Sequence, residues 1–399
     1  MTPTLETEPD CSGVLTDPAP AMTGPVASPR LTAERRPFGS IDRSTWDRLA
    51  AANPWATPFS RWAFHRAWWD AYGASAHEDT LTLCDGVHAE PVGIVPLMHR
   101  HVVEATDEAT RSTIRHGPPV SLTAIDANCK VVFFGASYHA DYATILTAPK
   151  DLVSAADALV GELANDPPPG GAAPWEVVDL RRLRTGDPSL DALAAAFKQR
   201  GAAQGWSVTT EQEEVCPVVT LAEGADFDAY LRTLSKKSRH EIRRKIRRAE
   251  NAGELRLVES TDPAVDLEAF IDLHQRRWGD DGLFPPTPGG GASRLFVRRL
   301  FELTDDGMTR LMFLTVGGRR IAAGIHFETP ERLFLYNAGT DPDTRDLSPG
   351  VVMVGRYIEW AIERGIRQID FMRGAEPYKY DWGAVDEPVQ RLLVRRPGV

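Results

Sequence analysis

The hydrophobic positions in the first half of the chain switch between helical and strand periods, which predicts a mixed α/β unit. Phe59, Trp62, Trp69 and Tyr72 are three or seven residues apart, as on one face of a helix that enters a core. Apolar runs on both sides of an Asp-Gly turn signal at 85–86 predict two paired strands. Further strands are predicted over 129–135, 141–148 and 175–180, and helices over 151–166 and 189–202.

The second half of the chain predicts strand, helix, helix, three strands, helix and strand, in that order. The Pro- and Gly-rich segment 283–293 is expected to be a loop. The first half shows a weaker version of the same order, so we expect two copies of one fold, joined near residues 205–220. Helices are predicted over 227–253, 266–280, 294–307 and 347–365, and strands over 216–221, 255–260, within 309–340 and over 366–374.

The length of 399 residues suits two compact domains and a tail. The first 35 residues or so are rich in Pro, Thr, Ala and Asp and hold almost no large apolar side chain. Such a segment buries too little surface to offset the entropy lost on ordering. We therefore expect a disordered tail at 1–35, an N-terminal domain at 36–210 and a C-terminal domain at 211–399.

Composition excludes several classes of protein. A net charge of −11 and a pI near 5.5 argue against a chain whose main task is to coat nucleic acid or an anionic membrane. No run of about 18 apolar residues predicts a membrane span, and the N-terminus does not read as a signal peptide, so we expect a cytoplasmic protein. We expect no metal site, because no cysteine forms a CxxC pair. The four cysteines are Cys11, Cys84, Cys129 and Cys216.

The start of the helix predicted over 347–365 is a candidate anion site. Ser348 is expected to cap the helix, Pro349 to take its first position, and Gly350 to let a ligand approach the backbone. The unpaired N–H groups and the positive dipole end of such a helix suit a phosphate or pyrophosphate. The signal is weak by itself, because Ser-Pro-Gly starts many helices that bind nothing.

The chain resembles a known family over most of residues 40–390. The sequence SPG, the helix VVMVGRYIEWAIERG and the segment IDFMRGAEPYKYDWG look like those of the CelD-like acetyltransferases, whose GNAT-type domain is related to the Fem peptidyltransferases. The resemblance implies an α/β fold with two tandem GNAT-like domains. It also implies a loop that cradles the pyrophosphate of acetyl-CoA or another acyl-CoA, here with Arg345, Ser348, Pro349, Gly350 and Val351.

One feature departs from the family pattern. The phosphate loop of ordinary GNAT enzymes is basic and rich in glycine, whereas DTRDLSPG holds one glycine and two extra acids, Asp343 and Asp346. These acids would repel phosphate unless Arg345 and the helix end prevail. Acyl-CoA is therefore implied by the resemblance only, and aminoacyl-tRNA, which Fem proteins use, stays an open alternative.

The segment FMRGAEPYKYDWG supplies candidate acid and base groups. Acyl transfer to an amine requires a base for the amine proton, stabilisation of the oxyanion and an acid for the leaving thiolate. Asp370 and Glu376, with Asp381, are candidate bases, and Tyr378 and Tyr380 are candidate acids. The segment also has a purely structural interpretation.

In that structural interpretation the rings Tyr378 and Tyr380 pack on the sheet, while the two basic side chains Arg373 and Lys379 pair with the neighbouring acids. In the functional interpretation, Arg373 and Lys379 contact the substrate instead.

Basic and aromatic residues elsewhere are candidates for substrate binding. The helix LSKKSRHEIRRKIRRAE is most simply a solvated amphipathic helix, or else a patch for a polyanion such as coenzyme A phosphates or tRNA. Arg239 lies nearest its apolar side and is the residue we expect to be buried or to face a ligand. Arg277 and Trp278 precede the loop at 283–293 and are expected at the acceptor cleft.

The sequence thus predicts an N-acyltransferase that moves an acyl group from acyl-CoA to an amine or hydroxyl of an acceptor, such as a sugar or a cell-envelope precursor. The first domain would shape the acceptor cleft between the two units. The alternatives are a Fem-type transferase that uses aminoacyl-tRNA and a catalytically inactive binding scaffold.

Overall fold

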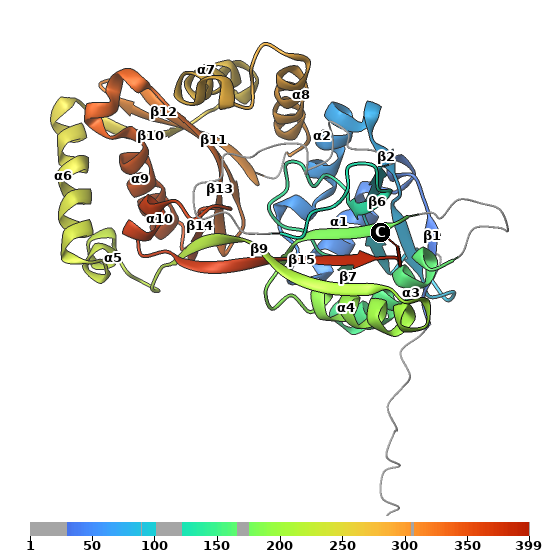
Figure 1. The fold of residues 1–399 in the computed structure, drawn as a ribbon. Coiled ribbons are helices and arrows are strands. Elements are labelled where there is room, and N and C mark those ends of the chain that lie inside the picture. The colour runs from blue at the N-terminus through green and yellow to red at the C-terminus, as the bar shows by residue number, and fades with distance from the viewer. Residues whose placement is uncertain (1–29, 89, 101–121, 166–174, 305–306, 399) are drawn as a thin grey trace, which may run out of the picture.

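A computed structural model describes residues 30–88, 90–100, 122–165, 175–304 and 307–398. The described chain forms two α/β halves joined by two long central strands, β9 and β15 (Figure 1). Most of the expected tail lies outside the described residues. Residues 32–35, which we had placed in that tail, form a strand.

The N-terminal half runs from the first strand to the long strand β9. Its elements are β1 (Thr32–Arg35), α1 (Arg43–Ala52), α2 (Trp62–Tyr72), β2 (His77–Glu78), β3 (Leu81–Cys84), β4 (Gly93–Val95), β5 (Leu97–Arg100), β6 (Val131–Phe134), β7 (Leu146–Thr147), α3 (Leu152–Leu163), β8 (Val177–Arg184), α4 (Pro188–Gly201) and β9 (Ser207–Thr220). Strands β3 and β4 pair antiparallel, as the turn signal between them predicted.

The C-terminal half begins with two helices and ends with the second long strand. Its elements are α5 (Phe227–Thr233), α6 (Lys236–Ala252), β10 (Leu255–Glu259), α7 (Pro263–Trp278), α8 (Pro288–Leu303), β11 (Thr309–Val316), β12 (Arg319–Glu328), β13 (Arg332–Thr340), α9 (Pro349–Glu363), β14 (Gln368–Asp370), α10 (Pro377–Asp381) and β15 (Val385–Arg395). The three expected strands within 309–340 and the expected helix after Ser348 are present.

The two halves repeat one order of elements. After α5 and α6, the C-terminal half runs strand, two helices, three strands, helix, strand, helix, strand, and the N-terminal half follows the same order with its middle strands broken into shorter pieces. Each half holds one parallel strand pair at the same place in this order, β6 with β8 and β13 with β14. The expected fold class, α/β with two tandem domains of one type, is confirmed.

The last strands of the two halves are exchanged. Strand β9, which ends the N-terminal half, pairs with β14 of the C-terminal half, and β15, which ends the C-terminal half, pairs with β8 of the N-terminal half. The two long strands also pair with each other along their whole length, which joins the halves into one 11-stranded sheet. The expected domain boundary at 210/211 falls inside β9, so neither half has a complete sheet without the other.

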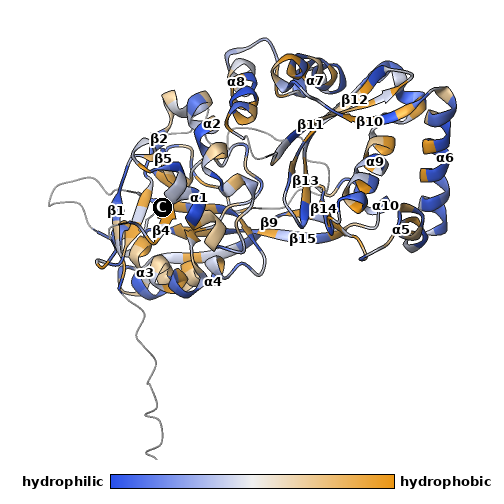
Figure 2. Cartoon of the chain, turned by 180° about the vertical axis from the view of Figure 1, so that it is seen from behind, coloured by the Kyte–Doolittle hydropathy of each residue, from blue (hydrophilic) through white to orange (hydrophobic). Residues whose placement is uncertain are grey.

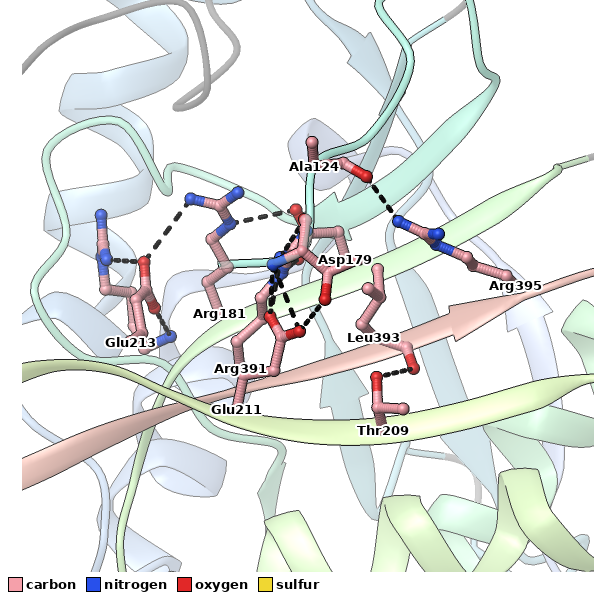
Figure 3. Close-up of polar contacts among 11 residues, drawn as sticks. Ala124, Asp179, Arg181, Thr209, Glu211, Glu213, Arg391, Leu393 and Arg395 are labelled. Carbon is pink, nitrogen blue, oxygen red and sulfur yellow. Dashed lines mark hydrogen bonds and ion pairs between the residues drawn. The ribbon is translucent and has the colours of Figure 1, made fainter. Parts of the chain in front are cut away.

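A buried ion network fastens this junction (Figure 3). Arg391 of β15 is 0% exposed; its guanidinium donates to Asp179 of β8 at 2.6 Å and to Glu211 of β9 at 2.9 Å. It also donates to the carbonyl of Thr123 at 2.7 Å. The three strands at the junction are therefore tied by one side chain. Its loss would leave Asp179 with Arg181, at 3.0 Å, and Glu211 with the N–H and hydroxyl of Thr123.

The aromatic helix of the first half enters a core that both halves share. The ring of Phe64 on α2 meets Phe296 on α8 at 5.4 Å, edge to face. Phe64 and Trp68 are fully buried, whereas Trp62 and Trp69 are only half-buried. The buried face of α2 is therefore rotated about the helix axis from the predicted face, although Phe59 and Tyr72 are buried as predicted.

Two other expectations of secondary structure were wrong. The long helix expected over 227–253 is two helices, because the hydroxyl of Ser235 accepts from Ser238 N at 3.1 Å and starts α6 anew. Much of the loop expected over 283–293 is the first turn of α8, capped by Thr287. Gly290 suits that turn, since a Cβ there would lie 1.9 Å from the carbonyl oxygen of Pro285.

Candidate functional site

The candidate site lies where two parallel strands of the C-terminal half separate. Strands β13 and β14 pair at only three positions, ending at Phe334 opposite Asp370. Beyond that point, residues of 335–340 and 371–374 line a cavity of about 710 Å³. The edges of the two strands that face each other there are open to a ligand.

A β-bulge marks the same point on β13. Ile325 of β12 pairs with Asn337, and Phe327 pairs with Phe334. Between these two pairs β13 therefore has one residue more than β12. An extra residue leaves the ladder locally unpaired and re-aims its side chain. The bulge lies at Leu335 and Tyr336, which both line the cavity.

Both halves form the cavity wall. The N-terminal half contributes Tyr138, His139 and Asp141 from the segment between β6 and β7, together with Glu214 of β9. The C-terminal half contributes residues of α7, β13, α9 and α10. Those of the sequence-predicted site residues that line the cavity are Arg277, Trp278, Gly350, Val351, Arg373, Glu376, Tyr378 and Lys379.

The N-terminus of α9 opens into the cavity through Gly350 and Val351. Pro349 takes the first helical position, as predicted. Ser348 does not cap the helix with its side chain; it is in the left-handed region with φ 54° and its hydroxyl makes no cap hydrogen bond. The first N–H groups of α9 therefore lack a side-chain partner, which makes them donors for an anion.

Two acids of the loop before α9, Asp341 and Asp343, pair with arginines that do not line the cavity. Asp341 is 2% exposed and binds Arg276 at 2.7 Å and Arg319 at 2.5 Å. Burial alone would raise the pKa of Asp341, but the N–H of Asp343 and these two arginines lower it. Asp343 also pairs with Arg276, at 2.8 Å. The repulsion of phosphate expected from this loop is thereby reduced.

Lys379 organises the segment that follows β14. Its Nζ is buried and donates to the carbonyls of Met372, Arg373 and Gly374 at 2.9–3.0 Å. Met372 has φ 61°, a conformation that costs energy for a residue with a side chain, and its N–H donates to Asp370 at 2.9 Å. Lys379 and Asp370 thus hold the cavity wall in shape.

Glu376 and Tyr378 are the acidic and phenolic groups of this segment that reach the cavity. Glu376 Oε2 lies 2.8 Å from Lys379 Nζ, but accepts no hydrogen bond within the described part of the chain. Burial and the neighbouring carboxylate of Glu376 raise the pKa of Tyr378. The phenol therefore keeps its proton at neutral pH and can donate it.

Other predicted site residues lie away from the cavity. Asp370 is 0% exposed and binds the Tyr142 hydroxyl at 2.7 Å and Arg332 at 3.1 Å. Burial raises the pKa of Asp370, against the effect of Arg332. The hydroxyl of Tyr380 donates to Asp386 at 2.8 Å, and burial and this bond raise the pKa of Tyr380 to about 12.

The basic helix α6 also lies outside the cavity lining. It runs along the outer edge of the molecule, with mainly hydrophilic residues (Figure 2). Arg239 donates to the carbonyl of Arg232 at 3.3 Å and is not part of the cavity. Arg248 reaches the loop before α9 and donates to Asp346 O at 2.5 Å. Arg345 is exposed in that same loop.

Helix α7 supplies one wall through His274, Arg277 and Trp278. The guanidinium of Arg277 stacks over the Trp278 ring at 4.8 Å. His274 Nε2 accepts from Leu283 N at 3.2 Å, so its Nδ1 carries the proton that is donated to Ala338 O, also at 3.2 Å. Burial lowers the pKa of His274 to about 4.

We expect this histidine to make the protein sensitive to acid. An unfolded histidine titrates near pH 6.5, so between about pH 6.5 and 4 the unfolded chain binds the extra proton, and stability falls as the pH falls. From pH 7 to 5 His274 alone should lower the free energy of unfolding by about 2 kcal/mol. Buried His65, whose pKa burial lowers to about 3, acts in the same direction.

Urea denaturation of the wild type and His274→Gln at pH 7 and 5 checks this prediction. In the variant, the fall in the free energy of unfolding from pH 7 to 5 should be smaller than in the wild type by about 2 kcal/mol, because His65 and His326 still contribute to it. His240→Gln, on the exposed side of α6, should keep the full pH dependence. Equal pH dependence in the wild type and His274→Gln would contradict it.

Sequence reasoning missed most of the residues that the N-terminal half brings to the cavity. Tyr138, His139 and Asp141 precede Tyr336 by about 200 residues, and nothing in their spacing indicates that they meet it. The sequence pattern places Tyr336 in a predicted strand and Tyr357 in a predicted helix, and it marks neither as a site residue. The YHAD sequence, a cluster of ring and acid side chains after a strand, was the one available signal.

Two further features are absent from the described part of the chain. Among those residues, no group of three or more His, Cys, Asp or Glu side chains could hold a metal ion. In the same residues, no helix combines the length and apolar character needed to cross a membrane.

The cavity lies between separating parallel strands, with a helix N-terminus at its mouth. Residues 236–380, within the C-terminal half, match the family described as acetyltransferase (GNAT) domain. The resemblance to the GNAT superfamily is thereby confirmed. No curated protein matches the chain.

Solved structures support the fold of the whole chain. FemX superposes with a TM-score of 0.55 at 12% identity, over 88% of this chain and 96% of its own. A conserved protein of unknown function from Bacteroides thetaiotaomicron VPI-5482 gives 0.50 at 11%, over 89% and 98%. A tandem GNAT protein from the clavulanic acid biosynthesis pathway gives 0.45 at 9%, over 92% and 99%. At these identities, the first two show a shared fold.

Proposed function

We propose that the protein is an N-acyltransferase that uses an acyl-CoA. The observation that carries this proposal is the opening of the α9 N-terminus into the cavity at the point where β13 and β14 separate. The N–H groups of Gly350 and Val351 would bind the pyrophosphate, and exposed Arg345 would add a positive charge beside it. The acyl chain would then enter between the two strands.

The other side of the cavity suits an acceptor that carries an amine. Of its four acids, Asp141 is bound to Arg373 and Glu376 to Lys379, whereas Glu214 and Asp281 have no ion-pair partner within the described ranges. Carboxylates without a cation partner attract an ammonium group. Glu214 and Asp281 would attract the ammonium group to the cavity. Glu376 Oε2, which accepts no hydrogen bond in the described part of the chain, would then hold the amine, and Tyr378 would protonate the departing thiolate. The acceptor would be a small molecule or a glycan.

One observation favours a second candidate, a transferase that uses aminoacyl-tRNA. Helix α6 carries exposed Lys236, Lys237 and Arg247, which could contact phosphates. Several of its other cations already have partners, such as Arg243 with Asp228 at 2.6 Å and Arg244 with Glu241 at 2.6 Å. The acyl-CoA proposal is the stronger one, because α6 does not reach the cavity.

Thermal unfolding in the presence of each donor tests the proposal. Acetyl-CoA at about 100 times its Kd should raise Tm by about 3 °C, since it binds only the folded chain. A rise with tRNA that disappears at high salt would favour the second candidate. No rise with acetyl-CoA at about 1 mM would contradict the proposal, because the KM values of enzymes typically lie between about 1 μM and 1 mM.

A further inference from the structure

A chain of hydrogen bonds leads from the cavity into the junction of the two halves. The hydroxyl of Tyr336, on the bulge of β13, donates to His139 O at 3.2 Å and lies 3.3 Å from His139 Nδ1. His139 Nε2 lies 2.7 Å from the hydroxyl of Tyr72, which lies 2.9 Å from Ser293 Oγ. Ser293 in turn donates to Gly289 O at 3.2 Å. The two outer side chains, Tyr336 and Ser293, belong to the C-terminal half, and the two inner ones, His139 and Tyr72, belong to the N-terminal half.

The imidazole of His139 is held in one orientation. The ring stacks on Phe296 at 4.4 Å with an angle of 6° between the planes, and the residue is 7% exposed. Because the ring plane is fixed by this contact, its two nitrogens keep their separate partners, Tyr336 on the cavity side and Tyr72 on the inner side.

The order of donors fixes which nitrogen carries the proton. Ser293 uses its only hydroxyl hydrogen on Gly289 O, so it must accept from Tyr72. Tyr72 then accepts from His139, which places the proton of a neutral imidazole on Nε2. Nδ1 therefore carries a lone pair and lies 3.3 Å from the hydroxyl of Tyr336, a residue that lines the cavity. That hydroxyl donates its hydrogen to His139 O, and a turn of the O–H bond directs it to Nδ1.

We propose that His139 is the base of the acyl transfer and that the Tyr336 hydroxyl relays the proton to it. This inference rests on the acyltransferase function proposed above. The hydroxyl oxygen of Tyr336 accepts a hydrogen bond from the nucleophile in the cavity, while its own proton moves to His139 Nδ1. Glu376 then positions the amine and does not need to take its proton.

The step balances with the groups already described. The neutral amine attacks the thioester carbonyl and forms the C–N bond. The nitrogen gives a proton to Tyr336 as Tyr336 gives its own to His139. The C–S bond then breaks, and the thiolate takes a proton from Tyr378. Finally, the imidazolium of His139 releases its proton and Tyr378 regains one from solvent.

The surroundings of the relay fit this role. The ionisable groups that act on Tyr336 are Asp141, Tyr72, Tyr138 and Arg373, of which Asp141 and Arg373 form an ion pair. Burial, followed by Asp141, raises the pKa of Tyr336 well above its ordinary value. Tyr336 therefore stays protonated and conducts a proton without becoming a lasting base.

Thiol release from acetyl-CoA, with 1,4-diaminobutane or water as the nucleophile, tests the inference. His139→Gln keeps an amide donor toward Tyr72 but lacks the Nδ1 lone pair, so we expect kcat to fall about 100-fold. Tyr336→Phe should lose a similar factor, and the double variant should be no slower than either single variant. Acetyl-CoA affinity should stay within about threefold of the wild type in all three.

The pH profile separates a base from a structural role. Wild-type kcat should rise with pH through one ionisation of a histidine, and this rise should be absent in His139→Gln. The exposed-site variant His88→Gln should keep it. The inference is overturned if His139→Gln binds acetyl-CoA, turns over at the wild-type rate and still shows the rise of kcat with pH. The proposed function would stand in that case. A wild type that binds acetyl-CoA but releases no thiol counts against both.

The predicted tautomer gives a test that requires no turnover. In protein labelled with ¹⁵N-histidine, NMR should show His139 with a protonated Nε2 and an unprotonated Nδ1 near neutral pH. The opposite tautomer would overturn the relay, since Nδ1 could then accept nothing from Tyr336. If His139→Gln fails to fold, the NMR measurement and the kcat of Tyr336→Phe still test the relay.

Discussion

Replacing Arg391 with methionine is expected to lower the free energy of unfolding by about 2–3 kcal/mol, because half-buried Glu211 would lose this cation and buried Asp179 would keep Arg181 alone, at 3.0 Å. The side chain is 0% exposed and joins three strands at the place where the halves exchange β9 and β15. The methionine side chain fills a similar space, so the loss would reflect charge rather than a cavity. Urea denaturation at pH 7 measures this difference.

Arg395→Met is the matched control. Arg395 lies on the same strand, four residues after Arg391, and is half-buried. Within the described part of the chain its side chain donates to a carbonyl alone, Ala124 O at 2.5 Å. Arg395→Met should cost about 1 kcal/mol or less. If the two variants were equally stable, the network in Figure 3 would not be what fastens the halves.

The second large effect is expected at the mouth of the cavity. Gly350→Asp should weaken acetyl-CoA binding about 100-fold, because it places a negative charge where the pyrophosphate would lie. The side chain has room, since a Cβ at Gly350 would meet nothing nearer than Thr340 Cγ2 at 4.0 Å. An acid at a helix N-terminus favours folding, so Tm should not fall. Isothermal titration with acetyl-CoA and a thermal scan give both quantities.

Gly350→Asn provides the uncharged comparison of almost the same shape. It should weaken binding no more than about fivefold, as it adds bulk but no charge. Equal affinity of the wild type and Gly350→Asp would place the donor somewhere other than the α9 N-terminus.

The sequence predicted those parts of the fold that depend on local pattern. The helix that starts at Pro349 and the strands around it follow from apolar periodicity and from a proline at the first helical position. The break before α6 was missed because Ser235 begins a new helix within a continuous amphipathic pattern. The glycines at the start of α8 read as a loop, since their tight contact with Pro285 is a tertiary feature.

The candidate site could be predicted only where it depends on local sequence. Glu376 and Tyr378 follow a buried strand in sequence and reach the cavity, whereas Asp370 and Tyr380, from the same segment, bind other side chains. The direction of each side chain depends on the turn that Lys379 imposes, which no spacing rule contains. The contribution of His139 depends on the exchange of strands between the halves, and that too is invisible in one sequence.

The exchanged strands also bear on how the site works. Glu214 of β9 lines the cavity, and Phe371 N and Gly374 N donate to the carbonyls of Pro217 and Val215 on the same strand. The last strand of the N-terminal half thus supports the segment that carries Glu376 and Tyr378. Each half on its own would lack part of the cavity wall, so the tandem arrangement is part of the site itself.

A crystal structure grown with coenzyme A tests the central claim most directly. The account predicts density for the pyrophosphate within about 3 Å of the N–H groups of Gly350 and Val351, and for the pantetheine arm between β13 and β14. Density for the nucleotide at another surface, or a cavity that stays free of it at saturating coenzyme A, would contradict the account.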